Sequence, residues 1–267
     1  MMNGVNPMSL AGRTILVTGA GQGIGLGVAR LAADLGANLV LADMNAAGLE
    51  AAAGQFAADR ALTGAGDIAD PDFVEGLVER AAARFGVVDG LVNTAGITRP
   101  AMIDKMTLAQ WDAVLRVHLT GSFLCMQAIG RRLIARHKAG EPTPAAIVNI
   151  SSDAGRQGTV GQINYSAAKA GLLGATMSAA REWARYGVRV NTVSFGLVET
   201  PMTEVIRGDK FRETYLARIP LGRNSGPSDT PAMVLFLCSQ ATAYVTGTAV
   251  AVDGGNSIGT YQPPANS

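Results

Sequence analysis

The sequence predicts one doubly wound α/β domain over residues 1–267, with a parallel β-sheet covered by helices on both faces. Short apolar runs rich in β-branched residues alternate with longer segments of helical periodicity along the whole chain, a pattern typical of this fold class. The first run leads directly into a turn that contains four glycines. No linker, internal repeat or block of like charge divides the 267 residues, a length that suits one large domain.

The strands are expected where the apolar runs are continuous rather than alternating, because parallel strands are buried on both faces. The first is Thr14–Thr18, with the sequence TILVT. The same pattern predicts strands at Asn38–Ala42, Val88–Asn93, Ala146–Ile150, Val188–Val193 and Ala249–Val252, and a weaker strand near Ala61–Gly66.

Helices are expected in the segments between these strands, where apolar residues recur three and four apart. Gly25–Leu35 stops before Gly36, a residue type suited to the left-handed position after a helix. Further helices are predicted at Asp72–Phe85, Thr107–His137, Ile163–Tyr186 and Pro227–Ser239. The segment Leu197–Arg223 holds two prolines among short helical patterns, so we expect a lid over a substrate site at 197–223.

Composition excludes several classes of protein. Hydrophobic residues make up 48% of the chain and charged residues 16%, which argues against disorder. The formal net charge of +1 gives no reason to expect nucleic acid or an anionic membrane as partner. Cys125 and Cys238 form no CxxC pair, which argues against a disulfide framework or a zinc cluster. No secretory signal or long apolar span is recognisable, so we expect a cytoplasmic protein without metal.

The glycine-rich turn at Thr18–Gly25 (TGAGQGIG) predicts a dinucleotide site. Gly19, Gly23 and Gly25 lie between a strand and a helix, where glycine permits a tight turn and close approach of backbone to a pyrophosphate. The free N–H groups at the start of the helix also attract phosphate. We therefore expect the turn to bind the cofactor through Gly19, Gly21, Gln22, Gly23, Ile24 and Gly25.

Asp43 ends the second predicted strand and favours NAD over NADP. A carboxylate there can accept hydrogen bonds from the ribose hydroxyls and would repel a 2′-phosphate. No Arg or Lys lies at 43–47, and the turn holds Gln22 rather than a basic residue. Asp43 could also cap the helix that follows it. Asp67 is open between adenine recognition and capping of the next turn.

The pair Tyr165 and Lys169 carries the expected chemistry. The two residues are four apart on a predicted helix and share one face. A free tyrosine has a pKa near ~10, and a neighbouring ammonium favours the phenolate, so Lys169 is expected to lower the pKa of Tyr165. Tyr165 would then serve as an acid or base between an alcohol and a ketone, with Ser152 hydrogen-bonded to the carbonyl oxygen.

These motifs resemble the short-chain dehydrogenase/reductase family, and the match covers nearly the whole chain. Its marks are the turn TGAGQGIG, NTAG at Asn93–Gly96, NISS at Asn149–Ser152, YSAAK at Tyr165–Lys169, RVNTVSFGLVET at Arg189–Thr200 and VDGG at Val252–Gly255. The Asn149–Gly171 segment is most similar to the 3-oxoacyl-carrier-protein reductase branch.

The resemblance implies a Rossmann-type, seven-stranded parallel sheet and a homotetramer or homodimer built on the helices at Thr107–His137 and Ile163–Tyr186. It implies that Tyr165 is the acid/base, that Lys169 activates it and binds the ribose, and that Ser152 binds the substrate carbonyl. Cofactor contacts are implied for Asp67, Ile68, Asn93, Ala95, Gly96, Val198 and Thr200.

Two residues depart from the family pattern. His118 stands where the family usually has Asn, whose main-chain carbonyl holds a water in a proton relay. Because that role belongs to the main chain, we expect His118 to be compatible with catalysis. Phe195 stands where the family usually has Pro, and its ring could narrow the pocket or pack beneath the strand end.

The sequence therefore predicts an NAD(H)-dependent oxidoreductase that interconverts a secondary alcohol and a ketone, including a 3-hydroxyacyl or 3-oxoacyl thioester among the candidate substrates. The alternative is a non-catalytic NAD-binding regulatory or assembly module on the same fold, since fold alone does not determine function. Such a module would be expected to lack Tyr165 or Lys169, and this chain keeps both.

Overall fold

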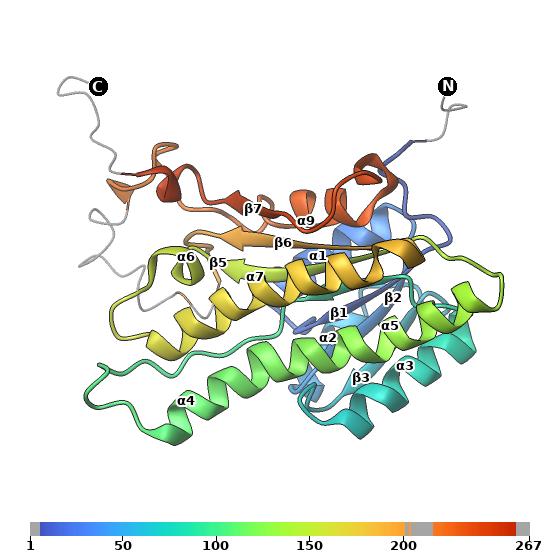
Figure 1. Cartoon of the computed structure of the whole chain (residues 1–267), viewed down its shortest axis with the longest axis horizontal. Helices are drawn as coiled ribbons and strands as arrows, with labels where there is room; N and C mark the ends of the chain where they lie inside the picture. Colours follow the sequence, from blue (N-terminus) through green and yellow to red (C-terminus); the bar gives the residue numbers. More distant parts are fainter. Residues whose placement is uncertain (1–5, 201–202, 204–215, 260–267) are drawn as a thin grey trace.

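Seven parallel strands form one sheet in the order β3-β2-β1-β4-β5-β6-β7 (Figure 1). This computed structural model describes residues 6–200, 203 and 216–259. The predicted doubly wound α/β fold is confirmed, and the weak run becomes the edge strand β3. The strands are β1 (Thr14–Thr18), β2 (Asn38–Asp43), β3 (Ala61–Ala65), β4 (Gly90–Asn93), β5 (Ala145–Ser152), β6 (Val188–Phe195) and β7 (Ala249–Val252).

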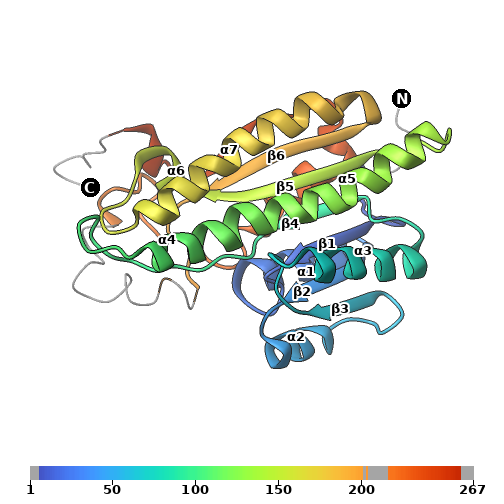
Figure 2. The ribbon, with the colours of Figure 1, turned by 60° about the horizontal axis from the view of Figure 1, so that its bottom comes forward.

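Helices cover both faces of the sheet (Figure 2). The structure contains α1 (Gly23–Asp34), α2 (Ala46–Ala53), α3 (Pro71–Phe85), α4 (Leu108–Leu115), α5 (Ser122–Lys138), α6 (Ala154–Gln157), α7 (Ile163–Trp183) and α9 (Pro231–Cys238). Side chains of α1, α2 and α9 pack on one face, and those of α3, α5 and α7 pack on the other.

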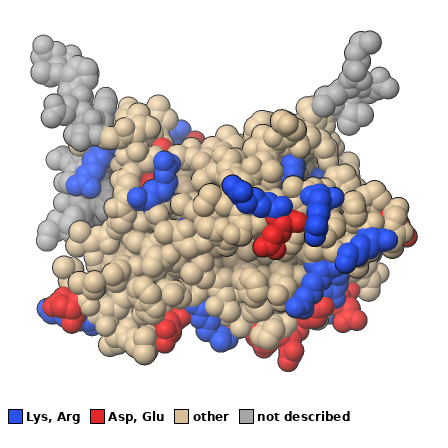
Figure 3. All heavy atoms as spheres, in the orientation of Figure 1, with Lys and Arg blue, Asp and Glu red and all other residues tan. Residues whose placement is uncertain are grey.

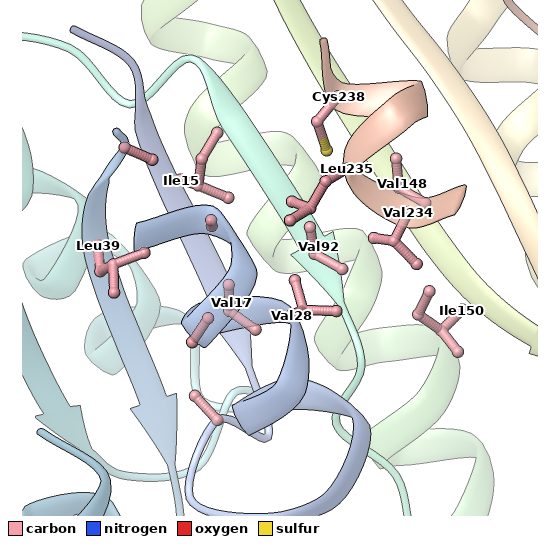
Figure 4. Close-up of a cluster of buried hydrophobic side chains, with 14 of the residues drawn as sticks. Ile15, Val17, Val28, Leu39, Val92, Val148, Ile150, Val234, Leu235 and Cys238 are labelled. Atoms are coloured by element: carbon pink, nitrogen blue, oxygen red, sulfur yellow. The ribbon is translucent and has the colours of Figure 1, made fainter. Parts of the chain in front are cut away.

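The core on the α1 side shows why the strands are apolar throughout (Figure 4). Val28 of α1 and Leu235 of α9 are fully buried against Val17 and Val92, which project from neighbouring strands. Burying one such side chain contributes about 1.5–3 kcal/mol, so a strand buried on both faces needs apolar residues at successive positions.

The helix predicted at Thr107–His137 is interrupted. A π-helical turn at Arg116–Gly121 separates α4 from α5, and Thr107 and Gln110 form a capping box at the start of α4. The whole stretch Leu108–Lys138 is long and apolar enough to cross a membrane, but half of its most apolar window is buried against the rest of the protein. Its packing on the sheet accounts for that apolar character.

Some boundaries differ from the prediction. The helix that could follow Asp43 is present as α2, but Asn45 rather than Asp43 caps it, with the Asn45 side chain accepting a hydrogen bond from the Gly48 N–H. β4 begins at Gly90 instead of Val88. Asp89 directly precedes β4, and its carboxylate accepts a hydrogen bond from the Thr14 N–H at 2.9 Å. This bond joins the start of β4 to the start of β1.

The strand order reverses direction between β1 and β4. Helix connections leave the sheet on opposite sides at such a point, so a crevice opens outside the carboxyl ends of the two strands. The glycine turn follows β1 and the NTAG segment follows β4, which brings both predicted motifs to this crevice.

Candidate active site

A cavity of about 350 Å³ lies at the carboxyl ends of the strands, within the size range of ligand sites. It brings together most of the predicted site residues. From the cofactor set these are Gly19, Gln22, Gly23, Ile24, Gly25, Asp43, Asp67, Ile68, Ala95, Gly96, Val198 and Thr200, and from the catalytic set His118, Ser152, Tyr165 and Lys169.

The glycine turn is packed so closely that side chains would not fit. A Cβ on Gly25 would lie 2.1 Å from the Gly19 carbonyl oxygen, and a Cβ on Gly19 would lie 2.9 Å from the Ala95 Cα. Gly19 and Gly23 also have positive φ angles of 66° and 56°. The tight turn and close backbone packing predicted for these glycines are therefore present, and the approach to a pyrophosphate stays a prediction.

Thr18 joins the glycine turn to the NTAG segment. Its hydroxyl accepts hydrogen bonds from the N–H groups of Thr94 and Ala95, each at 3.1 Å. The Thr94 hydroxyl donates in return to the Thr18 carbonyl. The last residue of β1 thus positions the backbone that follows β4, and Thr94 lines the cavity although it was not predicted.

Asp43 lies at the end of β2 and faces the turn. One carboxylate oxygen accepts a hydrogen bond from the Gly21 N–H at 2.9 Å, and the other accepts one from the Asn45 N–H at 2.9 Å. These bonds leave lone pairs for a ribose hydroxyl, because an ionised carboxylate offers about four acceptor sites.

Asp67 has the capping role that was one of the two alternatives the sequence left open. Its carboxylate caps the turn by accepting a hydrogen bond from the Ala69 N–H at 2.8 Å, and the residue also lines the cavity. Arg116, which the prediction missed, forms an ion pair with Asp67 at 2.8 Å. That hydrogen-bonded guanidinium holds the pKa of Asp67 below its usual value.

Two predicted cofactor residues do not line the cavity. Asn93 is buried, and its side-chain amide donates to the Asn149 side chain at 2.8 Å, so it links β4 to β5 inside the sheet. Gly21 packs against Asp43, and a Cβ on Gly21 would lie 3.0 Å from the Asp43 carboxylate oxygen. Both residues lie outside the cavity lining, and the residues that follow them in the chain, Gln22 and Thr94, line the cavity instead.

Ser152, Tyr165 and Lys169 meet at the other end of the cavity. Ser152 is the last residue of β5, and its hydroxyl hydrogen-bonds to that of Tyr165. Tyr165 and Lys169 lie on α7, with the Lys169 Nζ 5.5 Å from the centre of the Tyr165 ring. The Lys169 ammonium is buried and donates to the Ile150 carbonyl oxygen at 2.7 Å.

Burial shifts the proton equilibria of this pair in opposite directions. It raises the pKa of Tyr165, an effect that the hydrogen bond from Ser152 partly offsets. It lowers the pKa of Lys169 to about 7. The expectation that Lys169 lowers the pKa of Tyr165 is therefore wrong for this structure, because removal from water disfavours the phenolate and the ammonium alike.

His118 lies in the π-helical turn and is 1% exposed. Its ring meets the Tyr165 ring edge to face, with 5.2 Å between centroids. Nε2 is 3.1 Å from the Ile97 nitrogen and 2.9 Å from the Ile97 carbonyl oxygen, so one bond forms in either neutral tautomer. Burial and then the charge of Lys169 lower the pKa of His118 to about 3.

The last residue of β6 and the segment that follows it also line the cavity. Phe195 is 3% exposed; it packs in the core on the α1 side, as one of its two alternatives predicted, and it also lines the cavity. Thr203, which the prediction missed, donates from its hydroxyl to the Val198 carbonyl oxygen at 2.6 Å. Most of the predicted lid, at 201–202 and 204–215, lies outside the described residues.

The cavity fits a nicotinamide dinucleotide. The side-chain-free turn leads from β1 into α1, whose amino end supplies N–H groups for phosphates. A carboxylate for the ribose lies at one end, and a tyrosine, a serine and a buried lysine lie at the other. Among residues 6–200, 203 and 216–259, no group of three His, Cys, Asp or Glu side chains is placed to hold a metal ion. Fold and site define an oxidoreductase that uses a nicotinamide cofactor.

Comparisons with known proteins identify the family. A family model described as enoyl-(acyl carrier protein) reductase matches residues 19–257. A 3-oxoacyl-[acyl-carrier-protein] reductase of Thermotoga maritima is 39% identical over 253 residues, which cover 93% of this chain and 99% of the relative. The chain belongs to the short-chain dehydrogenase/reductase family, whose named relatives here act on CH–OH or keto groups.

Solved structures agree on the fold and differ in cofactor. A gluconate 5-dehydrogenase from Burkholderia cenocepacia, in complex with NADP and tartrate, has a TM-score of 0.89 at 33% identity, covering 95% of this chain and 98% of its own. A 3-ketoacyl-(acyl-carrier-protein) reductase from Brucella melitensis, complexed with NADH, has a TM-score of 0.85 at 34% identity, covering 93% and 100%. These two similar proteins therefore differ in both the bound cofactor and the substrate for which they are named.

Proposed function

We propose that this protein is an NAD(H)-dependent oxidoreductase that interconverts a secondary alcohol and a ketone, with Tyr165 as acid and base. The observation that carries the proposal is the shared position of Ser152, Tyr165 and Lys169 at one end of the dinucleotide cavity. Bound NAD(H) would supply the hydride transfer, and the protein orients the reactants and moves the proton.

The three residues divide the proton chemistry among them. The raised pKa of Tyr165 keeps its hydroxyl protonated at neutral pH, so it can donate a proton to a ketone oxygen during reduction. The Ser152 hydroxyl would donate a hydrogen bond to the same oxygen. Lys169, with a pKa of about 7, lies close enough to stabilise the phenolate that remains after this donation.

The preference for NAD rests on Asp43. Its carboxylate lies beside the turn, where a 2′-phosphate would meet a negative charge. The next residue, Met44, is 74% exposed and uncharged, and 43–47 hold no Arg or Lys that could pair with such a phosphate.

We also propose a homotetramer or homodimer in the cytoplasm. Phe123 on α5 and Met177 on α7 are half exposed, and the middle of the face that these helices form carries few charged side chains (Figure 3). A face of this kind, apolar and free of strong charge, suits contact with a second copy of the chain. Sedimentation equilibrium measures the assembly directly.

Replacement of Tyr165 by Phe tests the proposed reaction. We expect Tyr165→Phe to lower kcat for ketone reduction by about 10³-fold or more while NADH binding, measured by fluorescence, changes less than about twofold. Alcohol oxidation by the wild type should rise with pH, because the phenolate is the base. Unchanged physiological activity in Tyr165→Phe would instead favour the non-catalytic regulatory module.

A further inference from the structure

Several large apolar side chains that remain exposed belong to segments that hydrogen bonds join to the neighbours of Ser152 and Tyr165. The described residues include twelve such side chains, and five belong to four short segments beside Ser152 and Tyr165. Exposed apolar groups that gather in one place indicate a binding surface, whereas scattered ones do not. We call these five residues the apolar rim; they are Met102, Ile103, Val160, Leu221 and Ile258, exposed by 52%, 69%, 86%, 70% and 83%.

The first part of the rim lies beside Tyr165. Met102 and Ile103 are in the segment between β4 and α4, and Val160 is in the turn that precedes α7. The Ala101 N–H donates to the Gly161 carbonyl oxygen at 2.9 Å, which joins the two segments.

A second contact brings this part of the rim to the catalytic end of α7. The buried Asn164 side chain donates to the Arg99 carbonyl oxygen at 3.0 Å and accepts a hydrogen bond from the Tyr165 N–H at 2.8 Å. The residue next to the catalytic tyrosine therefore holds the segment that carries Met102 and Ile103.

The second part of the rim lies beside Ser152. Asp153 follows Ser152 directly, and its carboxylate accepts a hydrogen bond from the Asn256 side chain at 2.8 Å, which holds the turn that contains Ile258. The Leu221 N–H donates to the Gly254 carbonyl oxygen at 3.1 Å, so Leu221 lies on the same turn.

The two asparagine side chains that hold these segments together are committed to partners within the protein. Asn164 and Asn256 hold backbone and carboxylate partners, as described above. The charged residues of the neighbouring segments, Arg99, Asp104, Lys105 and Arg156, are exposed and of both signs. Among the described residues, the five rim side chains themselves therefore offer apolar surface to a substrate rather than donors and acceptors for several hydroxyl groups.

We propose that the apolar rim binds the body of the substrate, which is an alcohol or ketone with an alkyl or alicyclic group of several carbons rather than a polyhydroxylated compound. The inference rests on the proposed function, because the rim lies on segments joined to the neighbours of Ser152 and Tyr165, which would hold the reacting oxygen. It separates two kinds of relative, one named for an acyl substrate and one named for gluconate.

A homologous series of alcohols tests this proposal. With NAD as oxidant, kcat/KM should rise about two- to fourfold per added methylene from 2-butanol to 2-octanol, because each CH₂ enters apolar surroundings. Gluconate should react at least about tenfold less efficiently than 2-octanol. In the double variant Val160→Ser/Ile258→Ser, the rise per methylene should fall to less than about twofold, while kcat/KM for 2-butanol changes little.

Tyr244→Ser is the matched control, since Tyr244 is fully exposed and lies outside the rim and the cavity. It should leave the dependence on chain length unchanged. Calorimetric titration of the NAD-saturated protein with 2-octanone measures ligand affinity without turnover. The double variant should bind 2-octanone at least about fivefold more weakly than the wild type.

The outcomes separate the two proposals. A flat series, a preference for gluconate and unchanged binding of 2-octanone by the double variant would overturn the apolar rim and leave the oxidoreductase in place. Weakened 2-octanone binding by the double variant, together with no NADH from any alcohol, would support the rim and count against the proposed reaction.

Discussion

The two ends of the cavity are built on opposite principles. At the cofactor end, the shape depends on side chains that are missing, since a Cβ on Gly25 or Gly19 would strike backbone atoms. At the catalytic end, the chemistry depends on polar side chains that are buried, since His118 and Lys169 are 1% and 4% exposed. Substitution should therefore act mainly through shape at the first end and mainly through desolvation at the second.

Gly25→Ala should produce the largest effect at the cofactor end. The added Cβ would lie 2.1 Å from the Gly19 carbonyl oxygen, so the turn must move, at a cost of about 1–3 kcal/mol in the free energy of unfolding. We expect NAD affinity, measured by calorimetry, to fall by about 100-fold or more.

Gly27→Ala is the control for that substitution on the same helix. Its Cβ would meet nothing closer than the Pro227 carbonyl oxygen at 3.5 Å. It should stabilise the protein by about 0.5–1 kcal/mol through helix propensity and leave NAD binding intact. Equal losses in the two variants would show that the turn does not depend on the absence of a side chain at Gly25.

Asp43→Ser should change cofactor preference by about 100-fold in favour of NADP, because it removes the carboxylate that opposes a 2′-phosphate. The ratio of kcat/KM for NAD and NADP measures this effect. Asp59→Ser, at an exposed carboxylate outside the cavity, should leave the ratio unchanged. A wild-type enzyme that prefers NADP would refute the argument from Asp43.

Lys169→Met should reveal the desolvation at the catalytic end. The pKa of Lys169 is about 7 in the folded protein against 10.5 when unperturbed, so the folded state binds fewer protons between these values. The contribution of Lys169 to the free energy of unfolding therefore rises as pH rises through this window, by about 2 kcal/mol between pH 7 and pH 9.

Denaturant unfolding at the two pH values measures that contribution. Lys169→Met should lack the rise, whereas Lys138→Met, at an exposed lysine near the end of α5, should retain it. A rise that persists in Lys169→Met would mean that another group titrates.

His118→Asn should have the smallest effect. The pKa of His118 is about 3, so the ring stays neutral from pH 5 to pH 9 and adds no inflection of its own to the pH profile of kcat/KM. We expect kcat/KM to fall by no more than about threefold, through loss of the contacts with Ile97 and Tyr165. A more than tenfold increase in turnover would contradict the view that His118 is compatible with catalysis.

The prediction from sequence succeeded where function depends on neighbours along the chain. Each successful prediction could be made from one short segment of the sequence. They are the glycine spacing, the four-residue interval between Tyr165 and Lys169, and the position of Asp43 at a strand end. The prediction failed where contact with another segment decides whether a side chain points into the cavity or into the sheet. Asn93 was expected in the cavity, but its side-chain amide donates a hydrogen bond to Asn149 on the adjacent strand.

Electrostatics were predicted with the wrong sign for the same reason. The spacing of Tyr165 and Lys169 indicates that they are close, and closeness to an ammonium lowers a tyrosine pKa. The degree of burial is decided by β5, α7 and the π-helical turn together, and burial is the main cause of the raised pKa of Tyr165. The Arg116 partner of Asp67 lies 49 residues away in the chain, so no local pattern could indicate it.

By itself, the sequence determined the fold class, the family, the glycine turn and the spacing of Tyr165 and Lys169 on one helix, because each depends on periodicity or on short spacing. Only the tertiary structure decided which side chains line the cavity, how far Tyr165 and Lys169 are removed from water, and that the segments of the apolar rim are joined to the neighbours of Ser152 and Tyr165. Those properties arise where segments distant in the chain come together, and desolvation depends on all of the atoms that surround a group rather than on its neighbours in sequence.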